Sequence, residues 1–179
     1  CRLFGFRSVI QSQVHRSLVS ADNALMRQSE RHPDGWGVAY YQASAPHIIK
    51  SVATAIDDNL FRHVSGIVTS QTVVAHLRNA TQGSLSVINT HPFQFGSWVF
   101  AHNGQLSKFR AAEGFYEPVG DTDSEALFCD ILNHLRSHCD RNTPLEEVVE
   151  RLVCLSQTYA REGVFNLLLS KEMRYRLIP

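Results

Sequence analysis

Cys1 carries a thiol and a free α-amino group on one residue, and together these groups can perform nucleophilic catalysis. The pKa of an unperturbed α-amine is about 8, so part of it is neutral at about pH 7 and can accept the thiol proton. Nucleophile and base are therefore already adjacent. A leading cysteine can also result from processing alone, so other motifs must decide whether Cys1 acts as a nucleophile.

Three other segments hold groups suited to an amino-acid amide. Arg78 ends an apolar run, and its planar guanidinium can bind a carboxylate through two parallel hydrogen bonds, to which Thr81 can add a hydroxyl. Asn103 and Gly104 follow another apolar run and offer a side-chain amide and an unobstructed backbone N–H, the donors of an oxyanion hole. In segment 120–125, a carboxylate that points into a pocket can hold an ammonium group.

Each motif also has a plain structural interpretation. Most arginines are exposed, so Arg78 can be a solvent-facing residue at a strand end. Asn-Gly is the commonest hairpin dipeptide, so Asn103-Gly104 can be an ordinary turn that joins two strands. The carboxylates of 120–125 can cap a helix and interact with its dipole. Taken singly, the motifs leave both interpretations open.

The elements that must position these residues follow from apolar periodicity and turn residues. The sequence predicts strands over 2–7, 35–41, 47–52, 70–77 and 98–102, helices over 21–30, 57–63, 123–138 and 144–161, and a closing hairpin of 164–170 with 173–178. Strands towards both ends of the chain, with two long helices between them, indicate an α+β fold in which helices cover sheet faces. No repeat or linker divides the sequence, so we expect one domain over 1–179.

The composition argues against several classes of function. Basic and acidic residues number 17 each, so the chain lacks the positive field that collects nucleic acid or an anionic membrane. The apolar runs are too short to span a bilayer. The four cysteines form no CxxC pair and are too sparse for a disulfide scaffold, which favours reduced thiols in a cytoplasmic setting. We therefore expect a small-molecule substrate, with no nucleic-acid or membrane partner.

Six motifs lie in order at 1–5, 34–37, 76–81, 89–93, 101–106 and 120–125, with the sequences CRLFG, DGWG, HLRNAT, NTHPF, AHNGQL and GDTDSE. Together they resemble class II glutamine amidotransferases, most closely the stand-alone YafJ-like branch of that family. The similarity runs from Cys1 to segment 164–169, which is nearly the whole chain. It implies an N-terminal nucleophile hydrolase fold, a four-layer αββα sandwich of two antiparallel sheets between helical layers.

The resemblance also implies a role for each site residue. The implied roles are Cys1 as nucleophile and amine base, Asn103 and Gly104 as oxyanion donors, Arg78 with Thr81 on the α-carboxylate of glutamine, and Asp123 on its α-amine. The reaction would pass through a γ-glutamyl thioester and would require no metal or organic cofactor. His91 and His102 have no recognised metal-ligand spacing, so we expect them to have structural or pocket-shaping roles. We expect Trp36 in the core.

The resemblance does not identify the leaving group or the partner. The chain can be a hydrolase of glutamine or a γ-glutamyl conjugate, or a glutaminase subunit that delivers ammonia to a separate synthase. It can also be a catalytically silent γ-glutamyl-binding module, and a homo-oligomer is compatible with each of these readings. Relatives of this branch continue for several more strands, so we expect the sandwich to be incomplete at the C-terminal end of this chain.

Overall fold

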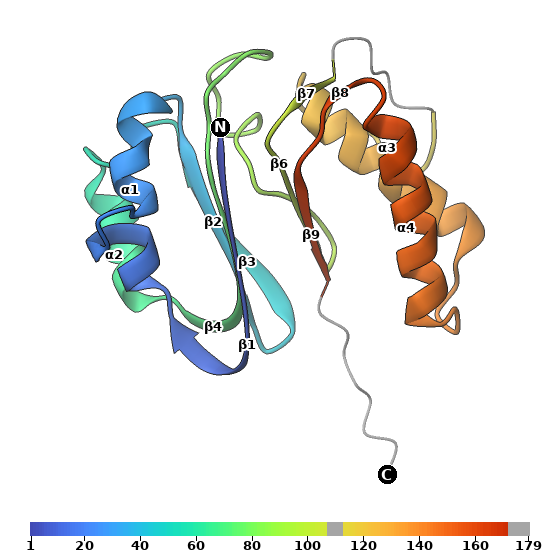
Figure 1. Ribbon diagram of the computed structural model, residues 1–179, viewed down its shortest axis with the longest axis horizontal. Helices are drawn as coiled ribbons and strands as arrows, with labels where there is room; N and C mark the ends of the chain where they lie inside the picture. Colours follow the sequence, from blue (N-terminus) through green and yellow to red (C-terminus); the bar gives the residue numbers. More distant parts are fainter. Residues whose placement is uncertain (107–112, 172–179) are drawn as a thin grey trace.

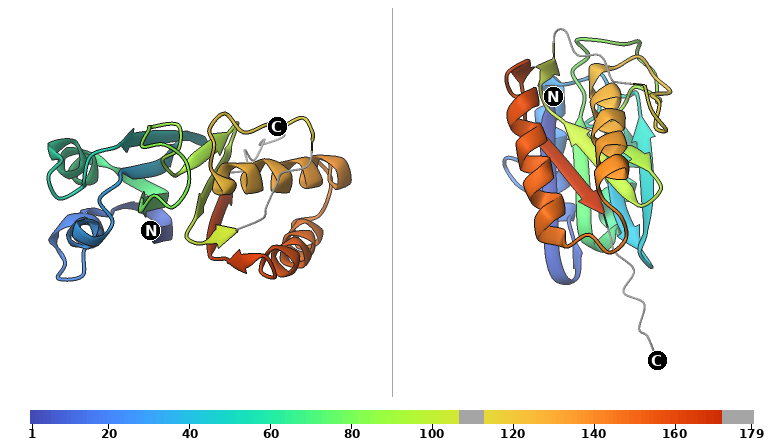
Figure 2. Two further views of the ribbon diagram at one scale, coloured as in Figure 1. Left: turned by 90° about the horizontal axis from the view of Figure 1, so that it is seen from above. Right: turned by 90° about the vertical axis from the view of Figure 1, so that its right-hand side faces the viewer.

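The computed structural model describes residues 1–106 and 113–171, in which two main antiparallel sheets, of four and three strands, pack between two layers of helices (Figures 1 and 2). A short two-stranded sheet, β7-β8, lies at one end of the sandwich. The first half contains β1 (Arg2–Gln13), η1 (Arg16–Ser20), α1 (Leu25–Gln28), η2 (Ser29–Arg31), β2 (Trp36–Gln42), β3 (Ala45–Ser51), α2 (Asn59–Ile67) and β4 (Thr69–Leu77). The second half contains β5 (Phe93–Phe95), β6 (Trp98–His102), β7 (Gln105–Leu106), α3 (Asp123–His138), α4 (Leu145–Tyr159), β8 (Gly163–Val164) and β9 (Leu167–Lys171). This is the predicted αββα sandwich.

The first sheet has the strand order β1-β4-β2-β3, and its register determines where the reactive terminus lies. Leu77 at the end of β4 pairs with Arg2 at the start of β1 and with Trp36 at the start of β2. Because neighbouring strands are antiparallel, the residues before β1, before β2 and after β4 meet at one end of the sheet. The register therefore brings Cys1 next to the segments that flank β2 and β4.

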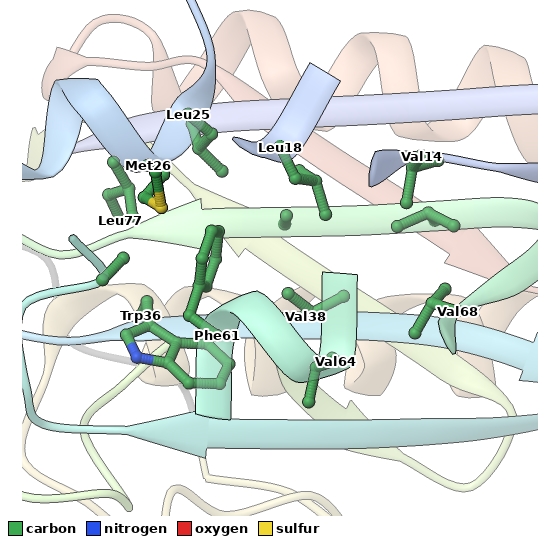
Figure 3. Close-up of a cluster of buried hydrophobic side chains, with 13 residues drawn as sticks. Val14, Leu18, Leu25, Met26, Trp36, Val38, Phe61, Val64, Val68 and Leu77 are labelled. Carbon is green, nitrogen blue, oxygen red and sulfur yellow. The ribbon is translucent and has the colours of Figure 1, made fainter. Parts of the chain in front are cut away.

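Helices α1 and α2 cover the outer face of this sheet over a cluster of buried side chains (Figure 3). Trp36 and Phe61 are both fully buried, and their rings meet edge to face with centroids 5.0 Å apart. Burial of each ring contributes about 2–3 kcal/mol. The indole N–H of Trp36 also donates to Asp58, the N-cap residue of α2, over 2.9 Å, so Trp36 is the core residue that was predicted.

The second sheet has the order β5-β6-β9, and helices α3 and α4 cover its outer face. Thr122 caps α3 by accepting a hydrogen bond from the Glu125 backbone N–H over 3.2 Å, and acidic residues occupy the first helical turn. Both features are favourable at a helix N-terminus. Between the two sheets lies a cluster of buried side chains, which consists of Ala39, Tyr41, Val74, Val99 and Ala101.

Several boundaries agree with the sequence predictions, and β6 and α3 agree to the residue. Strand β1 extends to Gln13 instead of Arg7, with an irregularity in its pairing after Arg7. The helix predicted over 21–30 is wrong in form, because Ala24 is extended and only a four-residue α-helix and a 3-10 turn follow. Segment 164–170 divides between β8 and β9, and the predicted strand 173–178 lies outside the described residues.

No helix within the described parts of the chain is long and apolar enough to cross a membrane.

Candidate active site

A small pocket forms where one end of the first sheet meets the turn after β6 and the start of α3. Its lining includes Cys1, Arg78, Thr81, Gly104 and Asp123, which come from four separate segments of the chain. The N-terminus lies at the same end of the sandwich as β7 and β8 in Figure 1 and in the right-hand view of Figure 2. The structure therefore gathers five of the six predicted site residues around one pocket. Asn103, the sixth, immediately precedes Gly104.

The α-amine of Cys1 lies partly buried at this pocket. Its pKa is lowered chiefly by burial and also by the charge of Arg2, while the carboxylate of Asp34 acts in the opposite direction. A lowered pKa increases the fraction of neutral amine near pH 7, which is the form that can accept a proton. The thiol contacts the backbone of Asn79, whose N–H donates to Sγ over 3.4 Å and whose carbonyl oxygen lies 3.6 Å from Sγ.

Asp34 joins the segment after β4 to the start of β2 through two hydrogen bonds. Its carboxylate accepts a 2.7 Å hydrogen bond from the Ala80 backbone N–H, and its own N–H donates to the carbonyl of Arg78 over 3.1 Å. These bonds hold the peptide that contacts the Cys1 thiol. The motif containing Asp34 was identified from the sequence, but this positioning role was not.

The guanidinium of Arg78 is buried and organises a loop of its own chain. It donates to the carbonyl oxygens of Ser84 over 2.9 Å, Gln82 over 3.0 Å and Gly83 over 3.3 Å. Burial lowers the pKa of Arg78, and Asp34 and Asp121 act to raise it. A guanidinium has five N–H donors, so these contacts leave donor capacity for a ligand in the pocket. The interpretation of Arg78 as a solvent-facing residue is wrong, because it is 3% exposed.

Asp123 is the first residue of α3 and joins that helix to β7. One carboxylate oxygen accepts from the Leu106 backbone N–H over 2.8 Å, and the other accepts from the Ser124 hydroxyl over 3.3 Å. Each carboxylate oxygen can accept further hydrogen bonds, so the side chain can still receive an ammonium group. The α3 cap is Thr122, which leaves Asp123 available to the pocket.

Asn103 and Gly104 do not form a hairpin turn. The strands that flank them belong to different sheets, because β6 pairs with β5 and β9 while β7 pairs with β8. The Asn103 N–H donates to the carbonyl of Asn166 over 2.8 Å. A Cβ at position 104 would overlap the carbonyl oxygen of Val164 and lie 2.5 Å from Nε2 of His102, so only glycine fits there.

Three buried histidines support the pocket. His91 and His102 line it, and the His76 ring lies behind with its centroid 4.2 Å from that of His91. Burial lowers the pKa of all three, to about 3 for His76. Neutral, closely packed rings agree with the expected pocket-shaping role of His91 and His102. The sequence placed His76 in an apolar run and in the 76–81 motif, but it did not indicate that this ring would pack against His91.

A partly buried contact between Asn89 and Asp121 holds the loop after Arg78 against the start of α3. The side-chain amide of Asn89 donates to the carboxylate of Asp121, and its carbonyl accepts from the Asp121 backbone N–H over 3.1 Å. Asn89 also donates to the Ser84 carbonyl over 3.1 Å. This contact joins two motifs that lie more than 30 residues apart, and it was not predicted from the sequence.

In residues 1–106 and 113–171, no group of three or more His, Cys, Asp and Glu side chains is placed to hold a metal ion.

Comparison with known proteins shows similarity to one family of sequences. The family model for class II glutamine amidotransferases matches residues 1–174. The YafJ protein of Escherichia coli strain K12 is 37% identical over 147 residues, which cover 78% of this chain and 57% of YafJ. The γ-glutamyl-hercynylcysteine sulfoxide hydrolase of Mycobacterium tuberculosis strain H37Rv is 36% identical over 104 residues, which cover 56% of this chain and 43% of the hydrolase.

The fold also matches a solved structure. The crystal structure of a predicted glutamine amidotransferase from Pseudomonas aeruginosa PA01 superposes with a TM-score of 0.68 at 32% sequence identity, covering 96% of this chain and 70% of that one. The chain spans about half the length of the curated relatives that it matches, 57% of YafJ and 43% of the hydrolase.

Proposed function

Because the chain belongs to the class II glutamine amidotransferase family, we propose that it hydrolyses the γ-amide of glutamine or of a γ-glutamyl conjugate through a thioester at Cys1. The observation that carries this proposal is the pocket that contains Cys1, Arg78, Gly104 and Asp123. These residues supply a nucleophile, a cation for the α-carboxylate, an oxyanion donor and an anion for the α-amine.

The reaction begins when the neutral α-amine of Cys1 takes the thiol proton, and the electron pair of the S–H bond stays on sulfur. The thiolate attacks the amide carbon, and the oxygen of the tetrahedral intermediate accepts hydrogen bonds from the Asn103 side chain and the Gly104 N–H. The C–N bond then breaks, and the α-ammonium gives its proton to the departing nitrogen. Water, activated by the same amine, releases glutamate from the thioester.

Recognition of the glutamyl end depends on opposite charges on two sides of the pocket. Arg78 with Thr81 binds the α-carboxylate, and Asp123 binds the α-ammonium. Arg78 and Asp123 therefore recognise only the α-carboxylate and α-ammonium groups, which glutamine shares with its γ-glutamyl conjugates. The name of the M. tuberculosis relative favours a conjugate with a larger amine as the substrate.

Delivery of ammonia to a separate synthase is the second candidate, and family membership is the observation that supports it. In that case activity would rise in the presence of the synthase and its acceptor substrate. The four free cysteines support a reducing, cytoplasmic setting for either reaction.

The proposal is tested by incubating the protein with 6-diazo-5-oxo-norleucine, an electrophilic glutamine analogue, and measuring its intact mass. We expect one adduct per chain, which is lost in Cys1→Ala and retained in Cys154→Ala. Cys154 is the matched control because its thiol is exposed and lies far along the chain from the pocket motifs. A folded protein that forms no adduct would favour the silent binding module instead.

A further inference from the structure

The imidazole of His32 contacts the α-amine of Cys1 across 31 residues of sequence. Its Nδ1 atom lies 3.3 Å from the amine nitrogen. The backbone holds His32 in place, because its N–H donates to the Ser29 carbonyl over 3.0 Å at the end of η2 and Pro33 follows directly. No other side-chain hydrogen bond to the amine is recorded among the described residues.

The surroundings keep this imidazole uncharged. Burial lowers the pKa of His32, and the positive charges of the α-amine, Arg2 and Arg31 lower it further. Asp34 is the acidic group whose charge acts on the amine itself. A neutral imidazole has one N–H and one bare nitrogen, so Nδ1 accepts a hydrogen bond when the proton is on Nε2.

A neutral amine has two N–H bonds and one lone pair, and only the lone pair can take the thiol proton. Rotation about the Cα–N bond places that lone pair in three staggered directions. If one N–H is held on Nδ1, the lone pair is restricted to the two remaining directions. When the amine becomes an ammonium, the same contact becomes a charge-assisted hydrogen bond, which is stronger.

We propose that His32 is a positioning residue that orients the α-amine of Cys1 by accepting one of its N–H hydrogens at Nδ1. This inference rests on the proposed function of the amine as the base. The proton that leaves the thiol remains on the amine until the leaving nitrogen takes it. His32 therefore keeps its own proton on Nε2 throughout and does not titrate during the reaction.

Two variants separate this role from a proton relay and from simple packing. His32→Ala removes the acceptor. His32→Asn keeps an acceptor, because the Asn side-chain oxygen occupies nearly the same place as Nδ1, but it cannot be protonated near neutral pH. A relay would be lost in both variants, whereas a positioning contact is restored in His32→Asn.

The first measurement is the tautomer of His32, determined by ¹⁵N NMR of the full chain. We expect the proton on Nε2. A proton on Nδ1 would overturn the proposal, because the ring would then donate to the amine lone pair and prevent it from acting as a base. This result does not depend on any activity of the protein.

The second measurement is the rate of Cys1 alkylation by 6-diazo-5-oxo-norleucine. We expect His32→Ala to react at least about 10-fold more slowly than wild type and His32→Asn to react within about 3-fold of it. Equal rates in all three proteins, or equal losses in both variants, would overturn the proposal. A wild-type protein that is not alkylated would refute the proposed function, and the tautomer would still decide whether His32 accepts from the amine.

Discussion

The buried pair of His76 and His91 predicts a loss of stability in mild acid. His76 is fully buried in β4, and its pKa is lowered to about 3, chiefly by burial. In the unfolded chain the pKa returns to about 6.5, so below that pH the unfolded state binds a proton that the folded state does not. The contribution of His76 to the free energy of unfolding is therefore constant above about pH 7. It becomes increasingly destabilising as the pH falls towards 3.

The size of this effect follows from the two pKa values. Between about pH 7.5 and pH 5.5, protonation of His76 in the unfolded chain lowers the free energy of unfolding by about 1.4 kcal/mol. His91, whose pKa is lowered in the same direction by burial and by His76, adds to the loss in wild type. Leucine is similar in volume to histidine, so His76→Leu removes the contribution of His76 and leaves that of His91.

The assay is urea unfolding of wild type and His76→Leu at the two pH values. We expect the free energy of unfolding to fall by about 1.4 kcal/mol less in the variant than in wild type. His47→Leu, at an exposed position of β3, controls for the loss of one histidine. Parallel pH dependences for wild type and His76→Leu, within about 0.3 kcal/mol, would refute the assignment of a neutral buried His76.

Two further predictions concern the pocket. Gly104→Ala drives a Cβ into the Val164 carbonyl, so we expect alkylation of Cys1 at least about 10-fold slower than in wild type. Gly66→Ala, at a glycine of α2 with open space around it, should react at the wild-type rate, and equal rates for both variants would contradict the steric argument. Arg78→Lys loses the bonds to the carbonyls of the 82–84 loop, so we expect about 1–3 kcal/mol lower stability in urea and faster proteolysis within that loop. An unchanged cleavage rate would mean that the guanidinium does not hold the loop.

The sequence predicted the local elements where one pattern dominated. Strand β6 is a short apolar run that ends at an Asn-Gly pair, and α3 has a cap, an acidic first turn and an apolar face. The 21–30 segment lacks such signals, and there the extended backbone of Ala24 divides the predicted helix. These differences arise because tertiary packing overrides weak local preferences.

For the candidate site, the residues that line the pocket could be predicted from motifs, but their contacts could not. The resemblance supplied Cys1, Arg78 and Asp123, which do line one pocket. Their hydrogen bonds depend on segments that meet only in the folded chain, such as the bond between Asp123 and the Leu106 amide. His32 was missed for the same reason, because nothing in its local sequence indicates that it lies beside the first residue.

The central claim is that Cys1 forms a γ-glutamyl thioester. The most direct test is rapid mixing of the protein with γ-glutamyl p-nitroanilide, in which released nitroaniline is followed and acid-quenched samples are digested and analysed by mass spectrometry. We predict a burst of about one equivalent per chain and a γ-glutamyl adduct on the peptide that contains Cys1. Turnover that persists in Cys1→Ala, or an adduct on any other residue, would contradict the account.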